Sequence, residues 1–194
     1  MKGISDSIAT ELSSQGIIQK EDVDKCKYGL EVMLSSLLEI LSILLLSVFV
    51  GNFLETLLLF AAFIPLRVYA GGYHANTKLK CYLISVAVYT VFTVTTYVLP
   101  EELYLLISVL CTVFSLTMVF NTAPIVHHNK SVNDIERKYY RKFSIIIVMA
   151  ETMIILVTTA ILPVSKIGIS LALGQFSVSL SMLVVVVKQQ LCNK

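Results

Sequence analysis

The stretch "YGLEVMLSSLLEILSILLLSVFV", from Tyr28 to Val50, decides the fold because almost all of its side chains are apolar. A helix needs about 20 such residues to cross the roughly 30 Å hydrocarbon core of a bilayer. In the whole chain of 194 residues, 56% are hydrophobic and 14% are charged, whereas soluble domains carry about 25% charged residues. The mean hydropathy is +0.82. These values predict a polytopic membrane protein with an all-α fold.

Five further apolar stretches give six expected transmembrane helices. They cover residues 53–69, 82–99, 103–121, 143–162 and 167–187. Turn and breaker residues separate them, at Gly51-Asn52, Pro100 and Pro163. Pro65 predicts a kink or a frayed last turn in the second helix. Residues 28–187 are therefore expected to form one membrane-embedded helical bundle, followed by a short tail at 188–194. A four-span chain with re-entrant segments is the alternative, because the polar region 67–81 is short.

The N-terminal segment, residues 1–27, differs from the rest of the chain. Ile4, Ile8 and Leu12 recur at intervals of four residues, which predicts a short amphipathic helix. Such a helix could lie on the inner membrane surface. Asp6 and Glu11 on the same segment argue against that location, and a loosely ordered tail is the alternative.

The basic residues give the expected orientation in the bacterial cell membrane. In a six-span arrangement, fourteen of the fifteen Lys and Arg residues fall on one side, and Lys166 alone falls on the other. Basic loops stay in the cytoplasm. Both termini and the region 67–81 are therefore expected on the cytoplasmic side.

Polar residues inside the expected spans form two stripes. One consists of Glu31, Ser35, Glu39 and Ser42, and the other of Ser170, Gly174, Ser177 and Ser181. Small and hydroxyl residues at this spacing are typical of helix–helix contacts in lipid, and they also favour self-association as a homodimer.

Glu39 and Glu151 fall near the middle of their spans, where a charge is costly. The favoured interpretation is a buried hydrogen bond within the bundle for each carboxyl group. The alternative is a path for protons or ions, which would make the protein a small transporter or exporter of a peptide or ion.

The stretch "RVYAGGYHANTKLKC", Arg67 to Cys81, holds a thiol and an imidazole seven residues apart. A histidine can accept the proton of a cysteine nucleophile and deliver it to a leaving amine. In a straight helix seven residues span about 10.5 Å, too far for a direct hydrogen bond. Gly71-Gly72 is therefore expected to break the helix, so that His74 can reach Cys81. An unrelated loop histidine and helix-start cysteine are the alternative.

Neighbouring residues suggest how this pair could be supported. Lys78, Lys80 and the start of the next helix would favour a Cys81 thiolate. Backbone N–H groups of the Gly-Gly turn could stabilise an oxyanion, and Arg67 could bind a substrate carboxylate. Metal chemistry through His74, Cys81, His127 and His128 is a weaker hypothesis, because adjacent histidines without a further ligand at suitable spacing are poor evidence. No metal and no other cofactor are expected.

The same stretch resembles the signature of the accessory gene regulator B (AgrB) family. The family pattern of an arginine, two glycines, a histidine and a cysteine seven residues later falls on Arg67, Gly71, Gly72, His74 and Cys81. The resemblance extends in outline over the whole chain.

A second part of the resemblance lies in the basic loop "TAPIVHHNKSVNDIERKYYRK". Ala123-Pro124 fits the family, whereas Ser131 stands where many members carry proline. That departure puts the local shape of the loop in doubt and leaves the chemistry unaffected.

The resemblance implies a membrane cysteine endopeptidase of bacterial peptide quorum sensing. Its substrate would be an AgrD-like propeptide on the inner leaflet. Cys81 would cleave the propeptide with His74 as base and then acid, and a cysteine or serine of the peptide would displace the resulting thioester to close a thiolactone or lactone ring.

The expected partners are this propeptide and membrane lipid, without nucleic acid. The basic residues Lys130, Arg137, Lys138 and Arg141 would contact the acidic tail of the propeptide or anionic lipid. Alternatively, these basic residues serve only to fix the orientation of the protein in the membrane. Whether His74 and Cys81 pair within one chain or across a dimer stays open.

Overall fold

A computed structural model describes residues 2–73, 77–125, 133–163 and 165–192. Its helices are α1 (Lys2–Ser14), α2 (Val23–Val50), α3 (Phe53–Ala70), α4 (Lys78–Val98), α5 (Tyr104–Thr122), α6 (Asp134–Ile161) and α7 (Lys166–Cys192), with short 3-10 turns at Lys20–Asp22 and Glu101–Leu103. Six of these helices, α2 to α7, are long and apolar enough to cross a membrane. The chain is therefore an all-α, multi-pass membrane protein with six candidate spans rather than four.

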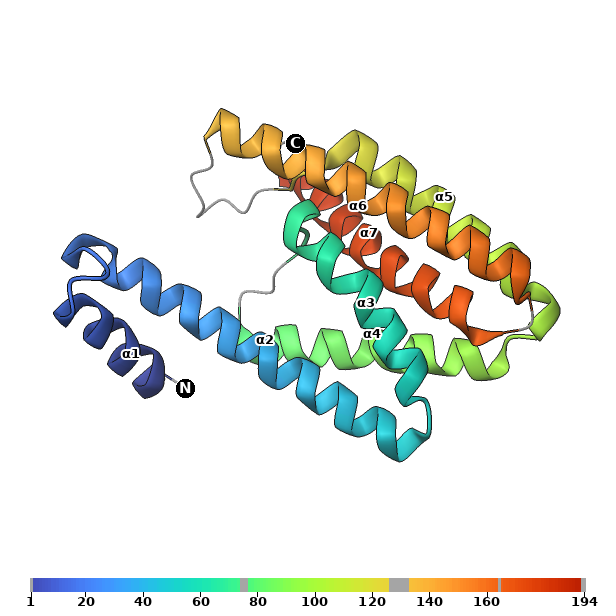
Figure 1. The fold of residues 1–194 in the computed structure, drawn as a ribbon, viewed down its shortest axis with the longest axis horizontal. Helices are drawn as coiled ribbons and strands as arrows, with labels where there is room; N and C mark the ends of the chain where they lie inside the picture. The colour runs from blue at the N-terminus through green and yellow to red at the C-terminus, as the bar shows by residue number, and fades with distance from the viewer. Residues whose placement is uncertain (1, 74–76, 126–132, 164, 193–194) are drawn as a thin grey trace.

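Helix α7 forms the centre of the bundle. It packs against α3, α5 and α6 (Figure 1). In its most apolar stretch 56% of the residues are buried, against 11% in α2. Two apolar clusters surround it. One contains Leu66, Val119, Val148, Val178 and Met182, and the other contains Phe92, Tyr104, Ile155, Ile169 and Leu173. Cys111 belongs to the second cluster, where it packs as a small apolar residue.

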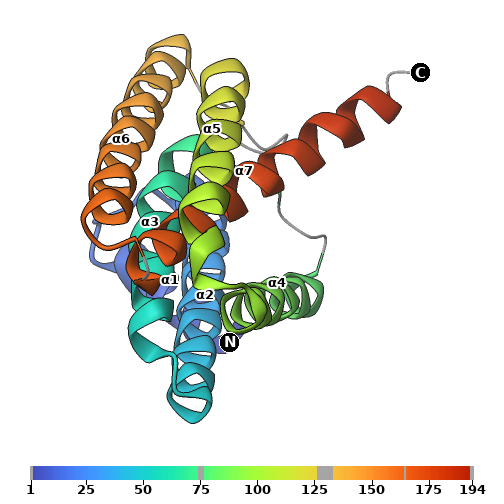
Figure 2. The same ribbon diagram turned by 90° about the vertical axis from the view of Figure 1, so that its right-hand side faces the viewer.

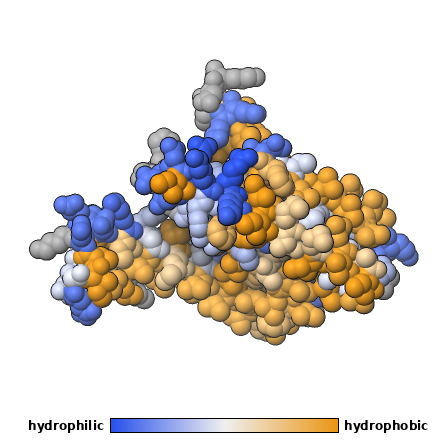
Figure 3. Space-filling view, turned by 45° about the horizontal axis from the view of Figure 1, so that its top comes forward, coloured by the Kyte–Doolittle hydropathy of each residue, from blue (hydrophilic) through white to orange (hydrophobic). Residues whose placement is uncertain are grey.

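The outer surface of the bundle is strongly apolar. Large side chains such as Phe49 and Val98 are 86% and 75% exposed. Figure 3 shows apolar residues over most of the visible body of the bundle, with hydrophilic residues along one ridge and around the end that holds α1. A surface of this kind suits contact with lipid, because it would aggregate in water.

The small-residue stripe of α7 makes the helix–helix contact that the sequence predicts. Ser170 and Ser177 are buried. A side-chain carbon at Gly174 would lie 2.3 Å from the backbone oxygen of Leu59 on α3. Close packing of α3 on α7 therefore requires glycine at position 174.

The helix ends differ from the sequence prediction. Helix α4 begins at Lys78 instead of residue 82, α6 begins at Asp134 instead of residue 143, and α7 continues to Cys192 instead of 187. Hydropathy marks only the part of a helix that crosses hydrocarbon, and backbone hydrogen bonding continues beyond it. Asn133 and Glu136 form a capping box that starts α6 in its polar region.

The N-terminal segment contains the expected helix, α1, in place of a loose tail. Ser5 and Ala9 of this helix are fully buried, whereas Ile8 is 40% exposed, so its location on the membrane surface stays a prediction. Helix α1 packs against α2, and Lys27 forms an ion pair with Asp6 at 3.5 Å. Figure 1 shows this α1–α2 pair extending away from the main bundle.

Successive helices run in opposite directions through the bundle. Figure 1 shows the N-terminal ends of α3, α5 and α7 toward the lower right and their C-terminal ends toward the upper left, while Figure 2 shows α7 crossing between its neighbours. The end of α3 and the start of α6 therefore lie on one side of the bundle.

Candidate functional site

The helix break predicted at the Gly-Gly pair is confirmed. Helix α3 ends at Ala70, and Gly71 and Gly72 have φ values of +78° and +139°. Both lie in the region that favours glycine. The N–H of Ile125 donates to the backbone oxygen of Ala70 at 2.9 Å. A side-chain carbon at Gly71 would lie 2.2 Å from the Ile125 oxygen, so the break is tied to the segment after α5.

Arg67, in the last turn of α3, holds the chain that leaves the helix. Its Nη1 donates to the Gly71 oxygen at 2.9 Å and to Ser181 Oγ at 2.8 Å, and its Nη2 donates to the Tyr73 oxygen. The Tyr73 N–H in turn donates to the backbone oxygen of Ser181 on α7 at 3.2 Å. The Arg67 guanidinium therefore forms one hydrogen-bonded framework with residues 71–73 and Ser181.

The same framework explains the second glycine. A side-chain carbon at Gly72 would lie 1.7 Å from Arg67 Nη1 and 2.3 Å from Ser181 Oγ. No other residue leaves room for the arginine to reach α7.

Arg67 also contributes a positive charge to the surroundings of the candidate nucleophile. Its guanidinium interacts electrostatically with the Cys81 side chain and with the Glu39 carboxylate. A cation beside a cysteine favours the thiolate form, which is the nucleophile. Glu39, at the middle of α2, therefore belongs to the surroundings of this site.

Cys81 lies in the first turn of α4 and is partly buried. Thr77 caps this helix, because its Oγ1 accepts from the Lys80 N–H at 3.3 Å, and the Cys81 N–H donates to the Thr77 oxygen at 3.0 Å. Lys78 Nζ pairs with Glu31 Oε2 at 2.5 Å and thereby joins the start of α4 to α2. The unsatisfied N–H groups of a first helical turn further favour a negative sulfur.

Several predicted residues lie outside the described part of the chain. These are His74, Lys130, His127 and His128. The approach of His74 to Cys81 therefore stays a prediction, as does any role for the adjacent histidines. Of the predicted set, Arg67, Gly71 and Gly72 share one hydrogen-bonded framework, and Cys81 lies in the first turn of α4.

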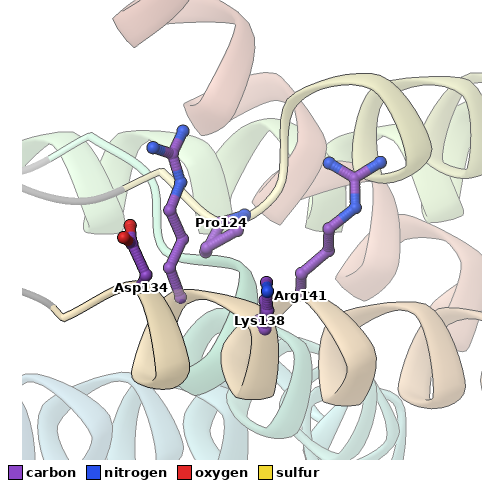
Figure 4. Close-up of a pocket in the computed structure, with 5 residues that line it drawn as sticks. Pro124, Asp134, Lys138 and Arg141 are labelled. Carbon is purple, nitrogen blue, oxygen red and sulfur yellow. The ribbon is translucent and has the colours of Figure 1, made fainter.

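Three of the four predicted basic residues line one pocket. It has a volume of about 360 Å³ and is bounded by Pro124, Asp134, Arg137, Lys138 and Arg141. Figure 4 shows Asp134, Lys138 and Arg141 on successive turns of α6, with Pro124 facing them from the chain after α5. Arg141 donates to the oxygens of Phe120 at 3.1 Å and Ala123 at 3.4 Å, which fixes α6 to the end of α5.

Comparison with known proteins gives the family. The family model described as accessory gene regulator B matches residues 5–187. The chain belongs to the AgrB family. This family takes part in processing the peptides of accessory gene regulator quorum sensing.

Three curated relatives resemble parts of the chain. Protein FsrB of Enterococcus faecalis (strain ATCC 47077 / OG1RF) is 46% identical over 63 residues, which are 32% of this chain and 26% of FsrB. Putative AgrB-like proteins 1 and 2 of Clostridium perfringens (strain 13 / Type A) are 25% identical over 109 residues and 29% identical over 144 residues. These matches cover 56% and 71% of this chain, and 57% and 67% of the respective relatives. No solved structure matches the chain.

Sequence reasoning on this AgrB protein missed two contacts of the site. The α7 stripe predicts helix packing for Ser181, and the structure also gives this residue hydrogen bonds to Arg67 and Tyr73. The sequence predicts a buried hydrogen bond or an ion path for Glu39, and in the structure its carboxylate interacts electrostatically with Arg67. A hydroxyl at the end of a packing stripe indicates contact with a neighbouring helix, but it does not identify the partner.

Proposed function

We propose that this protein is a membrane-embedded cysteine endopeptidase that cleaves an AgrD-like propeptide and promotes its cyclisation. The observation that carries the proposal is the position of Cys81, in the first turn of α4 and within the electrostatic influence of Arg67. Both features favour a thiolate. Family membership supports the class of substrate.

In the proposed first step, His74 takes the proton of the Cys81 thiol and the thiolate attacks a peptide carbonyl carbon. The carbon–nitrogen bond then breaks, and His74 delivers the proton to the leaving amine. The C-terminal fragment departs, and the N-terminal fragment stays on Cys81 as a thioester.

In the second step, an internal cysteine or serine of the peptide attacks that thioester. His74 accepts its proton and returns it to the departing Cys81 thiolate. The thioester keeps the peptide carbonyl reactive toward both the internal nucleophile and water. Ring closure must therefore be faster than hydrolysis of the thioester. Partial burial of Cys81 in the first turn of α4 supports this by limiting access of water.

The basic pocket on α6 fits the acidic C-terminal segment that the family resemblance implies for the substrate. Arg137 and Lys138 are exposed, whereas Arg141 is partly committed to backbone oxygens of α5. Pro124 joins this pocket to Ile125, whose N–H holds the end of α3. A peptide tail bound in the pocket would therefore lie on the same side of the bundle as the Gly-Gly break.

The pocket can be tested with charge reversal. Lys138→Glu is expected to raise KM for the precursor about tenfold with little change in kcat, because it removes attraction made before the chemical step. Lys142→Glu is the matched control, because Lys142 is exposed on the same helix and does not line the pocket. Equal KM values for the two variants would remove the pocket from substrate binding.

The catalytic assignment can be tested by co-expressing the protein with its precursor peptide and following precursor size. Cys81→Ser is expected to abolish cleavage, because a serine hydroxyl is not ionised by this environment. Cys26→Ser, in the first turns of α2, is the control and should cleave normally. Cleavage that persists in Cys81→Ser would end the proposal.

A second candidate function rests on Glu151. Both of its carboxylate oxygens are buried, and the side chain of Gln175 on α7 lies near them. An ionisable group at this depth is typical of proton and ion paths. If the protein transports a peptide or ion, Glu151→Gln should reduce flux into proteoliposomes while leaving precursor cleavage intact. Unchanged flux would remove Glu151 from such a path.

A further inference from the structure

Among the described residues, helix α7 meets the chain beyond the Gly-Gly break through the hydrogen bonds of Ser181 and through Lys188, whose Nζ lies 5.9 Å from the centroid of the Tyr73 ring. The Ser181 Oγ accepts from Arg67 Nη1 at 2.8 Å, and the Ser181 backbone oxygen accepts from the Tyr73 N–H at 3.2 Å. The Oγ itself donates to the Val178 oxygen at 2.7 Å, within α7. That intrahelical bond aims a lone pair of the hydroxyl at the guanidinium.

Arg67 links the Ser181 hydrogen bond to the candidate nucleophile, Cys81. The same Nη1 that bonds Ser181 also bonds the Gly71 oxygen, and the guanidinium interacts electrostatically with Cys81. If the serine hydroxyl is absent, one N–H of the guanidinium loses its acceptor in a partly buried place. The guanidinium would then turn to find another acceptor and would move relative to the sulfur.

We propose that Ser181 is a positioning residue of the peptidase reaction, which orients Arg67 beside Cys81 and fixes Tyr73 at the entry to the segment that carries His74. This inference rests on the proposed function and extends the site from α3 and α4 to α7. The consecutive helices α3 and α4 and the distant helix α7 then have to be assembled before Cys81 is competent.

The fit around Gly72 supports this role independently. A side-chain carbon at position 72 would collide with both Arg67 Nη1 and Ser181 Oγ. The backbone at Gly72 therefore lies directly against both side chains of the arginine–serine contact and leaves no space for a larger residue.

The experiment compares Ser181→Ala with Ser181→Thr, which restores the hydroxyl, and with Ser177→Ala. Ser177 is the matched control, because its Oγ donates to the Gly174 oxygen at 2.7 Å, the same type of intrahelical bond. In Ser181→Ala, kcat for precursor cleavage should fall on the order of tenfold or more, with KM within about twofold. Ser181→Thr should recover most of the rate, and Ser177→Ala should match wild type.

A second readout does not depend on peptidase activity. The rate of Cys81 alkylation by iodoacetamide at pH 7, followed by peptide mass spectrometry, reports the thiolate directly. It should fall severalfold in Ser181→Ala and recover in Ser181→Thr. Gly72→Ala, which obstructs the same contact by adding bulk, should also slow alkylation, whereas Gly29→Ala, in open space, should not.

The possible results separate the two proposals. A wild-type protein that cleaves no precursor would refute the proposed function, while the alkylation rates would still test the role of Ser181. Alkylation and kcat that are the same in Ser181→Ala, Ser177→Ala and wild type would overturn the positioning role. An equal loss in Ser181→Ala and Ser181→Thr would also overturn it, because the hydroxyl would then be irrelevant.

Discussion

Arg67 is the residue on which the most contacts of the candidate site converge. It bonds two backbone oxygens beyond the helix break and one hydroxyl on α7, and it interacts with Cys81 and Glu39. A guanidinium presents several N–H groups in a rigid planar fork, whereas an ammonium offers a compact point charge. The site therefore depends on the shape of this side chain as well as on its charge.

Arg67→Lys is accordingly expected to lower precursor cleavage by roughly 10- to 100-fold, because lost charge-assisted hydrogen bonds are worth about 1.5–3 kcal/mol each. Cleavage rates of the purified variant would measure this. Arg137→Lys, an exposed arginine on α6, should retain wild-type activity. If Arg67→Lys cleaves the precursor at the wild-type rate, a positive charge at position 67 is sufficient and the planar shape of the guanidinium is not required.

Sequence reasoning reached part of this site. The break at Gly71-Gly72 was predictable, because seven residues of straight helix cannot bring His74 to Cys81. The hydrogen bond between Arg67 and Ser181 was not predictable, because Ser181 lies 114 residues away and its distance from Arg67 depends on how α7 packs. No local pattern encodes such a pairing.

Helices α3 and α7 approach each other closely. The approach relies on Gly174, whose hydrogen faces the Leu59 backbone. This contact aligns the end of α3, with Arg67, against Ser181. Packing in the bundle and geometry at the site are therefore linked through one pair of helices.

Gly174→Ala should destabilise the protein by about 1–3 kcal/mol, because the added carbon overpacks against backbone that has little freedom to move. Thermal unfolding in detergent would show a lower midpoint. Gly29→Ala, with no neighbouring atom within 4 Å, should be neutral or slightly stabilising. Indistinguishable midpoints for the two variants would show that the close approach does not matter.

The number of helices was predictable and their ends were not. Apolar length identified all six spans, since about 20 residues are needed to cross the bilayer. The starts of α4 and α6 depend on polar caps, Thr77 and Asn133, which hydropathy does not register. The burial of Ser5 and Ala9 in α1 was not predictable, because the apolar spacing of its isoleucines does not register packing through small residues.

For the whole molecule, the expected orientation follows from charge. The end of α3, the start of α4 and the start of α6 carry seven of the fifteen Lys and Arg residues, the first 27 residues carry four, and α7 begins with Lys166. Cytoplasmic retention of basic segments would place Cys81 where thiols stay reduced and where a precursor is synthesised.

This orientation predicts a labelling pattern. In a chain whose natural cysteines are replaced by serine, Ser165→Cys should react with a membrane-impermeant maleimide on intact cells. A chain that keeps only Cys26 should react only after permeabilisation. The reverse pattern would invert the topology, and labelling of both on intact cells would refute the six-span arrangement.

The central claim is that Cys81 carries the peptide as a thioester. The most direct measurement is the intact mass of the purified protein in lipid nanodiscs, shortly after mixing with its precursor. We expect an added mass equal to the N-terminal fragment, located on Cys81 and removed by hydroxylamine, and no adduct with Cys81→Ala. Release of the C-terminal fragment at the wild-type rate from Cys81→Ala would contradict the account.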